Sequence, residues 1–174
     1  MTRIAINGMG RIGRIITRRY ITNPPDGLEL VAANDIDATD SIAYLMRYDS
    51  VHGRADFSVE ARQDTLKLGS KEVAVTHEPD PAKLPRKDLG VDIVLECTGL
   101  FRDHARASKH LEAGASKVII SAPSDSADLT IVMGVNEKVY DPAKRHIVSA
   151  ASCTTNSLAP VAIRYSTTPS ASST

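Results

Sequence analysis

The sequence predicts an α/β fold, in which a doubly wound, mostly parallel sheet carries an antiparallel meander insertion. Short apolar runs alternate with amphipathic helical patterns along most of the chain, which is typical of a parallel sheet covered by helices. Over residues 57–75 the runs become short and alternating, with turns near Gln63-Asp64 and Gly69-Ser70, which favours antiparallel strands. The 174 residues, 42% of them hydrophobic, suffice for one ordinary core.

The elements are expected in the following order. Buried strands are predicted over residues 3–7, 28–34, 91–97, 117–120, 129–133 and 146–149. Helices are predicted over 10–20, 39–46 and 103–114, the last with Asp103 as its N-cap. Pro24 and Pro25 end the first helix, and the proline-rich stretch 78–85 is a connection.

Composition excludes several classes of function. Lys plus Arg equals Asp plus Glu at 21 each, so no net charge favours nucleic acid or a membrane surface. No apolar run approaches the ~20 residues that span a bilayer, and the N-terminus lacks a signal-peptide pattern. Cys97 and Cys153 lie too far apart for metal-type spacing. We therefore expect a soluble cytoplasmic protein with free thiols and no metal site.

A glycine-rich run lies between the first predicted strand and the first helix. Gly8-Met9-Gly10-Arg11-Ile12-Gly13 matches the pattern G-x-G-x-x-G, which is weak evidence alone and stronger between a strand and a helix. Gly8 permits a tight turn, Gly10 lets a diphosphate approach, and Gly13 allows the helix to pack closely. The diphosphate would bind the free N–H groups of Arg11 and Ile12.

Asp35 ends the second predicted strand, about 20 residues beyond the last glycine, where dinucleotide-binding domains place an acid. Its carboxylate can accept hydrogen bonds from both ribose hydroxyls and would repel a 2′-phosphate. This favours NAD over NADP, although Asn34 could tolerate extra polar groups. The alternative is that Asp35 merely begins a turn.

Cys153 follows the last predicted strand and begins a helix-compatible pattern. The dipole and free N–H groups of a helix start favour the nucleophilic thiolate. Ser152 and Thr154 flank it with hydroxyls that could hold a phosphate or a substrate oxygen. The alternative is a capping segment with an inert cysteine, and the residues alone do not decide between the two. For Cys97, in a buried strand, a small apolar filler is the favoured interpretation.

Taken together, these motifs resemble the glyceraldehyde-3-phosphate dehydrogenase family. The match comprises AINGMGRIGR at 5–14, AAND at 32–35, YDSVHGR at 48–54, ECTGLF at 96–101, KVIISAP at 117–123 and SAASCTTN at 149–156. It extends from Met1 to about Ala162, and SCTTN at this distance from a glycine motif is highly specific.

The resemblance implies a Rossmann-type domain that binds NAD, within a homotetramer of glycolysis or gluconeogenesis. It implies the following cofactor-binding residues: Asn7, Gly8, Gly10, Arg11, Ile12, Gly13, Asn34, Asp35, Thr98, Gly99, Phe101 and Ser121. Cys153 would be the nucleophile, with Ser152 and Thr154 contacting glyceraldehyde 3-phosphate or inorganic phosphate. A relative acting on erythrose 4-phosphate and a non-catalytic dinucleotide-binding module are the alternatives.

The sequence departs from the family pattern at three places. Glu78-Pro79-Asp80-Pro81 stands where the family usually has Glu-Arg-Asp-Pro, so an arginine beside the adenine is absent. Ser157 replaces a second cysteine found in many members. The family's general-base histidine lies well beyond the nucleophile, whereas His146 is the last histidine here. We therefore expect an incomplete enzyme with little turnover, and an apolar patch where a further domain would pack.

The expected organisation is an NAD-binding domain over residues 1–152, the first helix of a truncated catalytic domain over 153–162, and a non-family tail over 163–174. The tail is expected to be disordered or the product of a frameshift. One back-translation of residues 163–173 supports the second possibility, because reading it from its third base gives KVLHDTFGIE, a family-like continuation. Sequencing the gene tests this hypothesis.

Overall fold

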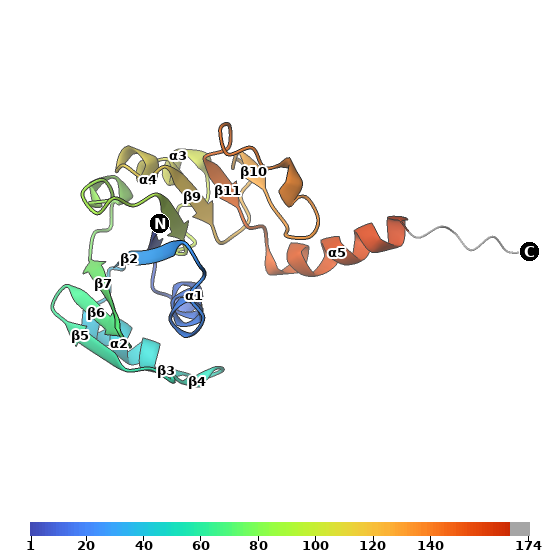
Figure 1. Ribbon diagram of the computed structural model, residues 1–174. Helices are drawn as coiled ribbons and strands as arrows, with labels where there is room; N and C mark the ends of the chain where they lie inside the picture. Colours follow the sequence, from blue (N-terminus) through green and yellow to red (C-terminus); the bar gives the residue numbers. More distant parts are fainter. Residues whose placement is uncertain (168–174) are drawn as a thin grey trace, which may run out of the picture.

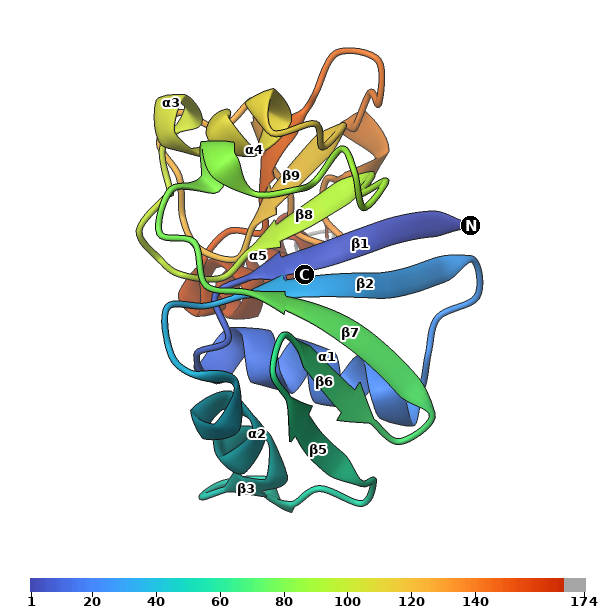
Figure 2. The same cartoon turned by 90° about the vertical axis from the view of Figure 1, so that its left-hand side faces the viewer.

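The computed structural model describes residues 1–167, which form one nine-stranded sheet, a small hairpin and surrounding helices. The strand order is β10-β11-β9-β8-β1-β2-β7-β6-β5, and Figure 2 shows β9, β8, β1, β2 and β7 fanned out beside one another. From β10 as far as β7 in this spatial order, each strand pairs in parallel with its neighbour. The pairs β7–β6 and β6–β5 are antiparallel. The predicted mostly parallel sheet with its meander is confirmed.

The elements of the main sheet agree with the predicted order. Its strands are β1 Thr2–Asn7, β2 Leu28–Asn34, β5 Val59–Arg62, β6 Thr65–Leu68, β7 Lys71–Thr76, β8 Ile93–Glu96, β9 Lys117–Ile120, β10 Leu129–Thr130 and β11 Ile147–Ser149. The hairpin consists of β3 Tyr48–Asp49 and β4 Gly53–Arg54. The helices are α1 Arg11–Thr22, α2 Thr39–Arg47, α3 His104–Ala107, α4 Lys109–Glu112 and α5 Cys153–Thr167, with 3-10 turns η1 Pro81–Lys83 and η2 Glu137–Val139.

The sheet is covered on both faces, because alternate residues of its central strands point to opposite sides. Ile4 and Ile6 of β1 join a cluster that includes Tyr20 of α1 and Met46 of α2. Ala5 belongs to a second cluster on the other face, together with Val94 of β8. The registers Ala5↔Val94 and Val94↔Val118 carry this face into a third cluster that includes Ala107 of α3. This arrangement makes the sheet doubly wound.

The predicted helix over 103–114 is instead two short helices. Asp103 caps the first, as expected, by accepting a hydrogen bond from Arg106 N–H at 2.8 Å. The helix breaks at Ser108, whose hydroxyl donates to Ala105 C=O at 2.8 Å and competes with regular helical bonding. The predicted strand over 129–133 ends already at Thr130, and the Asn136 side chain accepts the hydrogen bond of Val132 N–H instead.

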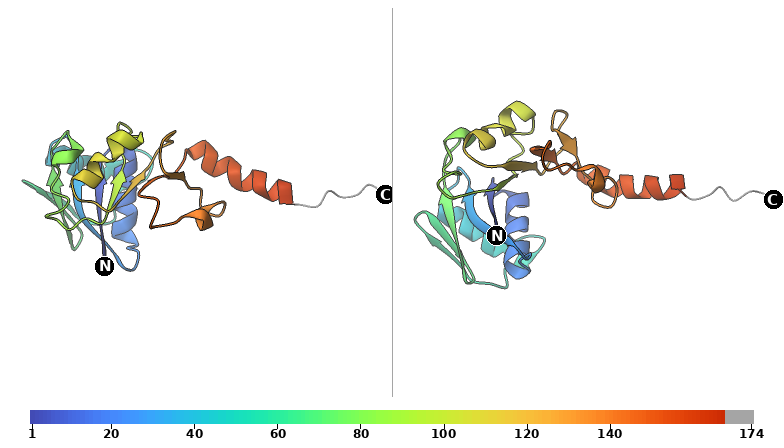
Figure 3. Two further views of the ribbon diagram at one scale, coloured as in Figure 1. Left: turned by 90° about the horizontal axis from the view of Figure 1, so that it is seen from above. Right: turned by 45° about the horizontal axis from the view of Figure 1, so that its top comes forward.

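α5 leaves the body of the molecule (Figures 1 and 3), and it continues through Thr167. Residues 163–167 are thus helical, and residues 168–174 lie outside the described part of the chain. The expectation of a non-family tail that is disordered or the product of a frameshift stays a prediction. Leu158, Val161 and Tyr165 of α5 are exposed. Within residues 1–167, no helix combines the length and the apolar character needed to cross a membrane.

Candidate functional site

A cleft of about 320 Å³ lies where β1, β2 and β8 end. In parallel sheets, ligands bind at the carboxyl ends of the strands, where successive connections diverge to opposite sides. The chain leaves β1 through α1 towards β2, whereas β8 flanks β1 on the other side. The cleft is lined by Asn7, Gly8, Gly10, Asn34, Asp35, Ile36, Glu78, Pro79, Cys97, Thr98, Leu100 and Phe101.

The glycine loop forms one wall of the cleft, and two of its glycines are required by close contacts. Gly8 has φ +93°, and a Cβ there would lie 2.7 Å from Thr98 N. A Cβ at Gly13 would lie 2.0 Å from Gly8 O, so only glycine lets α1 pack this closely. Gly10 differs, because a Cβ there would meet nothing within 4 Å. That open space beside the backbone fits an approaching diphosphate.

The start of α1 offers amides to such a group. The first helical hydrogen bond runs from Arg14 N–H to Gly10 C=O at 3.1 Å. The amides of residues 11–13 come before it and therefore have no acceptor within the helix. No side chain caps this end. Arg11 and Ile12 are the first two residues of α1, beside the cleft-lining Gly10, rather than in the cleft lining itself. Free amides at a helix N-terminus fit a diphosphate.

Asp35 ties the glycine loop to the end of β2, a role that the sequence did not reveal. Its carboxylate accepts hydrogen bonds from Met9 N–H at 2.6 Å and from Asp37 N–H at 3.0 Å. A carboxylate has about four acceptor positions, so two remain for ribose hydroxyls. Asp35 therefore both shapes the loop and retains capacity for a ligand.

Asn34 lines the cleft and connects the segments that form it, and its predicted role beside the cofactor stays a prediction. Its Nδ2 donates to Asn7 Oδ1 at 2.8 Å and to Glu78 C=O at 2.9 Å. Its Oδ1 accepts from Thr76 Oγ1 at 2.8 Å and from Glu78 N–H at 3.0 Å. Because all four hydrogen-bonding positions of the amide are used, Asn34 fixes the cleft without binding capacity to spare.

The other wall of the cleft comes from the segment after β8. Thr98, Leu100 and Phe101 line it, and Leu100 N–H donates to Thr98 Oγ1 at 3.0 Å. Of the predicted cofactor-binding residues, five fall outside the cleft lining, namely Gly99, Ser121 and the α1 residues Arg11, Ile12 and Gly13. Ser121 lies at the end of β9, where its N–H donates to Glu96 C=O at 3.0 Å.

Two buried charged residues behind this wall were missed by sequence reasoning. Glu96 is 1% exposed and hydrogen-bonds Asn7, Thr98 and His110. Arg86 is 0% exposed, and none of its guanidinium nitrogens has a hydrogen-bond partner among the described residues. Burial lowers the pKa of Arg86 to about 10, against the opposing attraction of Glu96. The Glu96 partners Asn7 and His110 lie 89 and 14 positions away in sequence, so no local pattern signals this network.

Cys97 is the inert filler that the sequence favoured. It is 9% exposed and belongs to the core cluster beneath α1. Burial raises the pKa of its thiol to about 11, although a hydrogen bond with Ser121 acts in the opposite direction. A thiol that remains protonated well above neutral pH is a poor nucleophile.

Cys153 is exposed and begins α5, at the same edge of the sheet as the glycine loop, because β11 runs parallel to the strands leading to β1. Ser152 caps this helix, since its Oγ accepts from Thr155 N–H at 2.9 Å. Ala151 holds the turn in the left-handed region with φ 61°. The capping interpretation is thus correct for Ser152, and the cap leaves the Cys153 thiol exposed at the helix start.

The hydrogen-bonding partner of the Cys153 Sγ among the described residues is Thr154 Oγ1, at 3.9 Å. Four of the five histidines bond other groups, and the fifth, His52, lines a separate hollow beside α1. His110 is buried against Glu96, His77 bonds Asp35 C=O, His104 pairs with Asp128, and His146 contacts Ser116 C=O. Within residues 1–167, then, no histidine is hydrogen-bonded to the thiol, nor do three or more metal-ligating side chains gather into a group.

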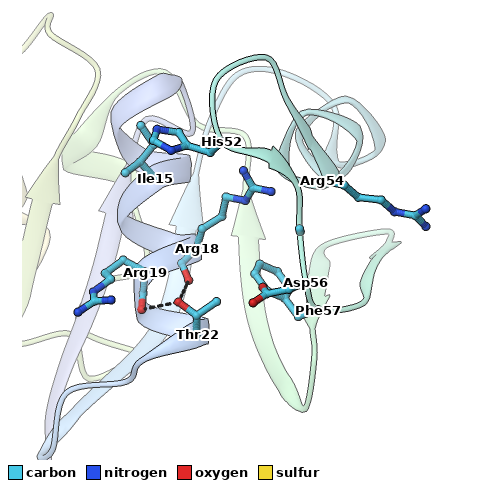
Figure 4. Close-up of a pocket in the computed structure, with 9 residues that line it drawn as sticks. Ile15, Arg18, Arg19, Thr22, His52, Arg54, Asp56 and Phe57 are labelled. Atoms are coloured by element: carbon cyan, nitrogen blue, oxygen red, sulfur yellow. Dashed lines mark hydrogen bonds between the residues drawn. The ribbon is translucent and has the colours of Figure 1, made fainter.

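A second hollow, of about 360 Å³, lies between α1 and the segment 52–57 (Figure 4). Arg18 points into it and donates to Gly53 C=O at 2.8 Å. Arg19 and Arg54 point away from it, and the Arg54 guanidinium lies 5.9 Å from the Tyr48 ring centroid. Because the positive charges do not converge, this hollow does not have the arrangement of an anion site.

The doubly wound sheet, glycine loop and terminal acid define a Rossmann-type nucleotide-binding domain. Residues 2–104 match the family model described as "Glyceraldehyde 3-phosphate dehydrogenase, NAD binding domain". The glyceraldehyde-3-phosphate dehydrogenases of Geobacillus stearothermophilus and Thermotoga maritima are 51% and 50% identical over 92% of this chain. The chain belongs to the glyceraldehyde-3-phosphate dehydrogenase family of oxidoreductases. It spans about half the length of these curated relatives, 47% and 48%.

Proposed function

We propose that the chain carries the NAD site and the nucleophile of an enzyme that oxidises glyceraldehyde 3-phosphate with inorganic phosphate to 1,3-bisphosphoglycerate. One observation carries the proposal. The exposed Cys153 thiol and the glycine loop both follow parallel strands, and thus lie at one edge of the same sheet. A nucleophile and a dinucleotide site at a shared edge are what an oxidation through a covalent thioester requires. The family membership supports the same chemistry.

The cofactor would bind along the carboxyl edge of the sheet. The amides of Arg11 and Ile12 would hold the diphosphate beside Gly10, and Asp35 would accept hydrogen bonds from the adenosine ribose. The negative charge of Asp35 favours NAD over NADP, because a 2′-phosphate would be repelled there. Phe101 would line the cleft that holds the cofactor. Gly99 and Ser121 would lie near the cofactor but outside the residues that line the cleft. When bound, NAD would accept a hydride from the substrate carbon.

The chemistry of this chain itself centres on Cys153. Its thiolate would attack the aldehyde carbon and form a hemithioacetal, which becomes a thioester after the oxidation. Inorganic phosphate would then attack the thioester carbon, release the thiolate and leave as the acyl phosphate. The N–H of Cys153 would stabilise the oxyanion. Thr154 would contact substrate or phosphate, while Ser152 would keep the thiol at the helix start through its capping bond.

A second candidate is a dinucleotide-binding module without turnover. The observation that favours it is the absence of a histidine hydrogen-bonded to Cys153 within the described residues, because deprotonating the hemithioacetal needs a base. We propose that the 174 residues alone turn over little. Erythrose 4-phosphate remains an alternative substrate at the same thiol. We further propose a cytoplasmic location and, for a chain with the full length of the family members, a homotetramer. The proposal includes no nucleic-acid or membrane partner.

The first test measures NAD binding to the 174-residue chain by calorimetry. We expect saturable binding to one site, with weaker binding of NADP. Gly10→Ala should weaken it, because a methyl group would occupy the space beside the diphosphate. The absence of any NAD binding would overturn the proposal and the second candidate together.

The second test measures modification of Cys153 by iodoacetate, followed by an assay with glyceraldehyde 3-phosphate, phosphate and NAD. Mass spectrometry should place the modification on Cys153 and leave Cys97 unmodified, with Cys153→Ser as the control. NADH formation clearly above that control would favour the dehydrogenase over the module. Equal NADH formation together with NAD binding would favour the module, and preferential labelling of Cys97 would contradict the assignment of the nucleophile.

A further inference from the structure

Glu96, the last residue of β8, is a buried acid directly behind the cofactor cleft. It is 1% exposed and uses both carboxylate oxygens. Oε2 accepts from Asn7 Nδ2 at 2.6 Å and bonds His110 Nε2 at 2.9 Å. Oε1 accepts from Thr98 N–H at 2.7 Å and from Thr98 Oγ1 at 2.5 Å. A buried carboxylate with four hydrogen bonds to three residues is strongly constrained in position.

The partners of Glu96 form the walls of the cleft. Asn7 and Thr98 both line it, and Gly8 packs directly on the Thr98 amide. Phe101 lines it as well, and its ring meets the His110 ring edge-on, with centroids 6.4 Å apart. One carboxylate therefore connects the end of β1, the segment after β8 and, through His110, an aromatic wall.

We infer that Glu96 is the positioning residue of the cofactor cleft, which fixes Asn7, Thr98 and Phe101 in the arrangement that receives the dinucleotide. Glu96 does not itself line the cleft, so it acts through its neighbours. The inference rests on the proposed NAD site and extends it to a buried residue. Its role is to set the walls in place before the ligand arrives, which lowers the ordering cost of binding.

The pattern of partners requires a carboxylate rather than a side chain of the same shape. Thr98 N–H can only donate, and Asn7 Nδ2 is held in its donor orientation because Asn7 Oδ1 already accepts from Asn34. These two donors meet opposite oxygens of Glu96. Glutamine offers one oxygen and one amide nitrogen, so in either orientation its N–H groups would face a donor.

The charge of Glu96 is balanced within the same layer. His110 is 0% exposed and bonded to Oε2, and Arg86 is 0% exposed and attracted to Glu96 electrostatically. The attraction between Arg86 and Glu96 offsets part of the cost of burying these two residues, and a neutral residue at position 96 would remove it. The buried charge of Arg86 therefore complements a carboxylate at this position, whose two oxygens are the acceptors that Asn7 and Thr98 need.

The test compares Glu96→Gln with Glu96→Asp in the 174-residue chain, using calorimetric NAD titration and urea unfolding. Glu96→Gln keeps the shape, whereas Glu96→Asp keeps a carboxylate at the expense of length. We expect Glu96→Gln to weaken NAD binding about tenfold or more, which corresponds to the loss of one charged hydrogen bond. Glu96→Asp should reduce the affinity for NAD by a smaller factor. The control Glu112→Gln removes an exposed carboxylate from α4 and should leave the affinity unchanged.

A role in shape alone predicts the reverse order, so better binding by Glu96→Gln than by Glu96→Asp would overturn the inference. Wild-type affinity in Glu96→Gln would also overturn it, while leaving the proposed NAD site intact. Absence of binding by the wild-type chain would overturn both.

Thr98→Val keeps the test valid if Glu96→Gln does not fold. It removes the hydroxyl that donates to Glu96 at nearly constant shape, and Thr98→Ser retains that hydroxyl. We expect Thr98→Val to bind NAD more weakly than Thr98→Ser. Where both variants fold, the losses of Thr98→Val and Glu96→Gln should be non-additive, because they break one network. Equal binding by Thr98→Val and Thr98→Ser, or strictly additive losses, would contradict the inference.

Discussion

The glycine loop between β1 and α1 and the thiol segment between β11 and α5 are both strand-to-helix turns at the carboxyl edge of one sheet, yet different parts of the chain hold them. Asn7 is fixed by Glu96 and Asn34, residues 89 and 27 positions away. Beyond Ala151, the side-chain hydrogen bonds that hold the start of α5 span at most six positions, and Cys153 is exposed. The cofactor end is thus set by the core, and the thiol end by local capping.

This difference orders the effects of substitution. Changes at the cofactor end should cost stability of the whole domain, because they disturb buried contacts between strands. Changes at the thiol end should alter only α5, because few contacts with the rest of the domain depend on it. Four predictions test this contrast.

The largest effect is expected for Gly13→Ala. The added Cβ would lie 2.0 Å from Gly8 O, so α1 must move away from β1. We expect the free energy of unfolding to fall by about 3 kcal/mol and NAD binding to be lost. Urea unfolding and calorimetry measure the two effects. Gly10→Ala is the matched control, since its Cβ meets nothing within 4 Å, and it should weaken NAD binding while changing stability by about 1 kcal/mol at most.

Arg86→Met should act in the opposite direction. The wholly buried guanidinium has no hydrogen-bond partner among the described residues, and its pKa of about 10 lies below the ordinary 12.5. This shift already includes the attraction to Glu96, so burial outweighs that attraction by about 3 kcal/mol. We therefore expect the free energy of unfolding at neutral pH to rise by about 2–3 kcal/mol. Arg19→Met, at an exposed position of α1, should change it by no more than about 0.5 kcal/mol. A less stable Arg86→Met protein would contradict this account of the core.

Cys97 should make stability depend on alkaline pH. Its folded-state pKa of about 11 exceeds the ordinary 9.0, so the folded protein holds the proton more tightly. The contribution is fully present below pH 9 and is lost as pH rises towards 11, amounting to about 2 kcal/mol. The measurement is the difference in unfolding free energy between wild type and Cys97→Ala across this range. Arg86 destabilises the folded protein less as pH rises above about 10, but it is present in both proteins, so its contribution cancels. A difference that does not vary with pH would contradict the prediction.

The smallest effect is expected for Ser152→Ala. It removes the cap that accepts from Thr155 N–H at 2.9 Å, which should cost about 1 kcal/mol. Because α5 leaves the body of the domain, we expect faster hydrogen exchange at the start of α5 and unchanged exchange in β1. Ser166→Ala, at a hydroxyl near the other end of α5, is the control. Accelerated exchange in β1 would show that the thiol end is not held independently.

Sequence reasoning was most successful where structure depends on local pattern. The strand, glycine run and helix of residues 2–22 are encoded by the period of apolar residues and by Gly13, whose close contacts with Ile6 and Gly8 are short in sequence. The meander and the Asp103 cap were predicted for the same reason. The break at Ser108 was missed because a single hydroxyl decides between helical and local bonding.

The parts that could not be predicted depend on contacts between distant residues. Asp35 was assigned as a ribose acceptor, but its bond to Met9 N–H appears only when β2 ends beside the loop. Glu96 lay within a recognised motif, yet its bonds to Asn7 and His110 require β1, β8 and α4 to be placed together. Arg86 gave no signal, because nothing in a proline-flanked connection predicts complete burial of a guanidinium.

The decisive measurement is a crystal structure of the chain grown with NAD. We expect the diphosphate against the amides of Arg11 and Ile12, the adenosine ribose at Asp35, and the nicotinamide on the side of the cleft that faces Cys153. A dinucleotide bound elsewhere, or a thiol turned away from the nicotinamide, would contradict it.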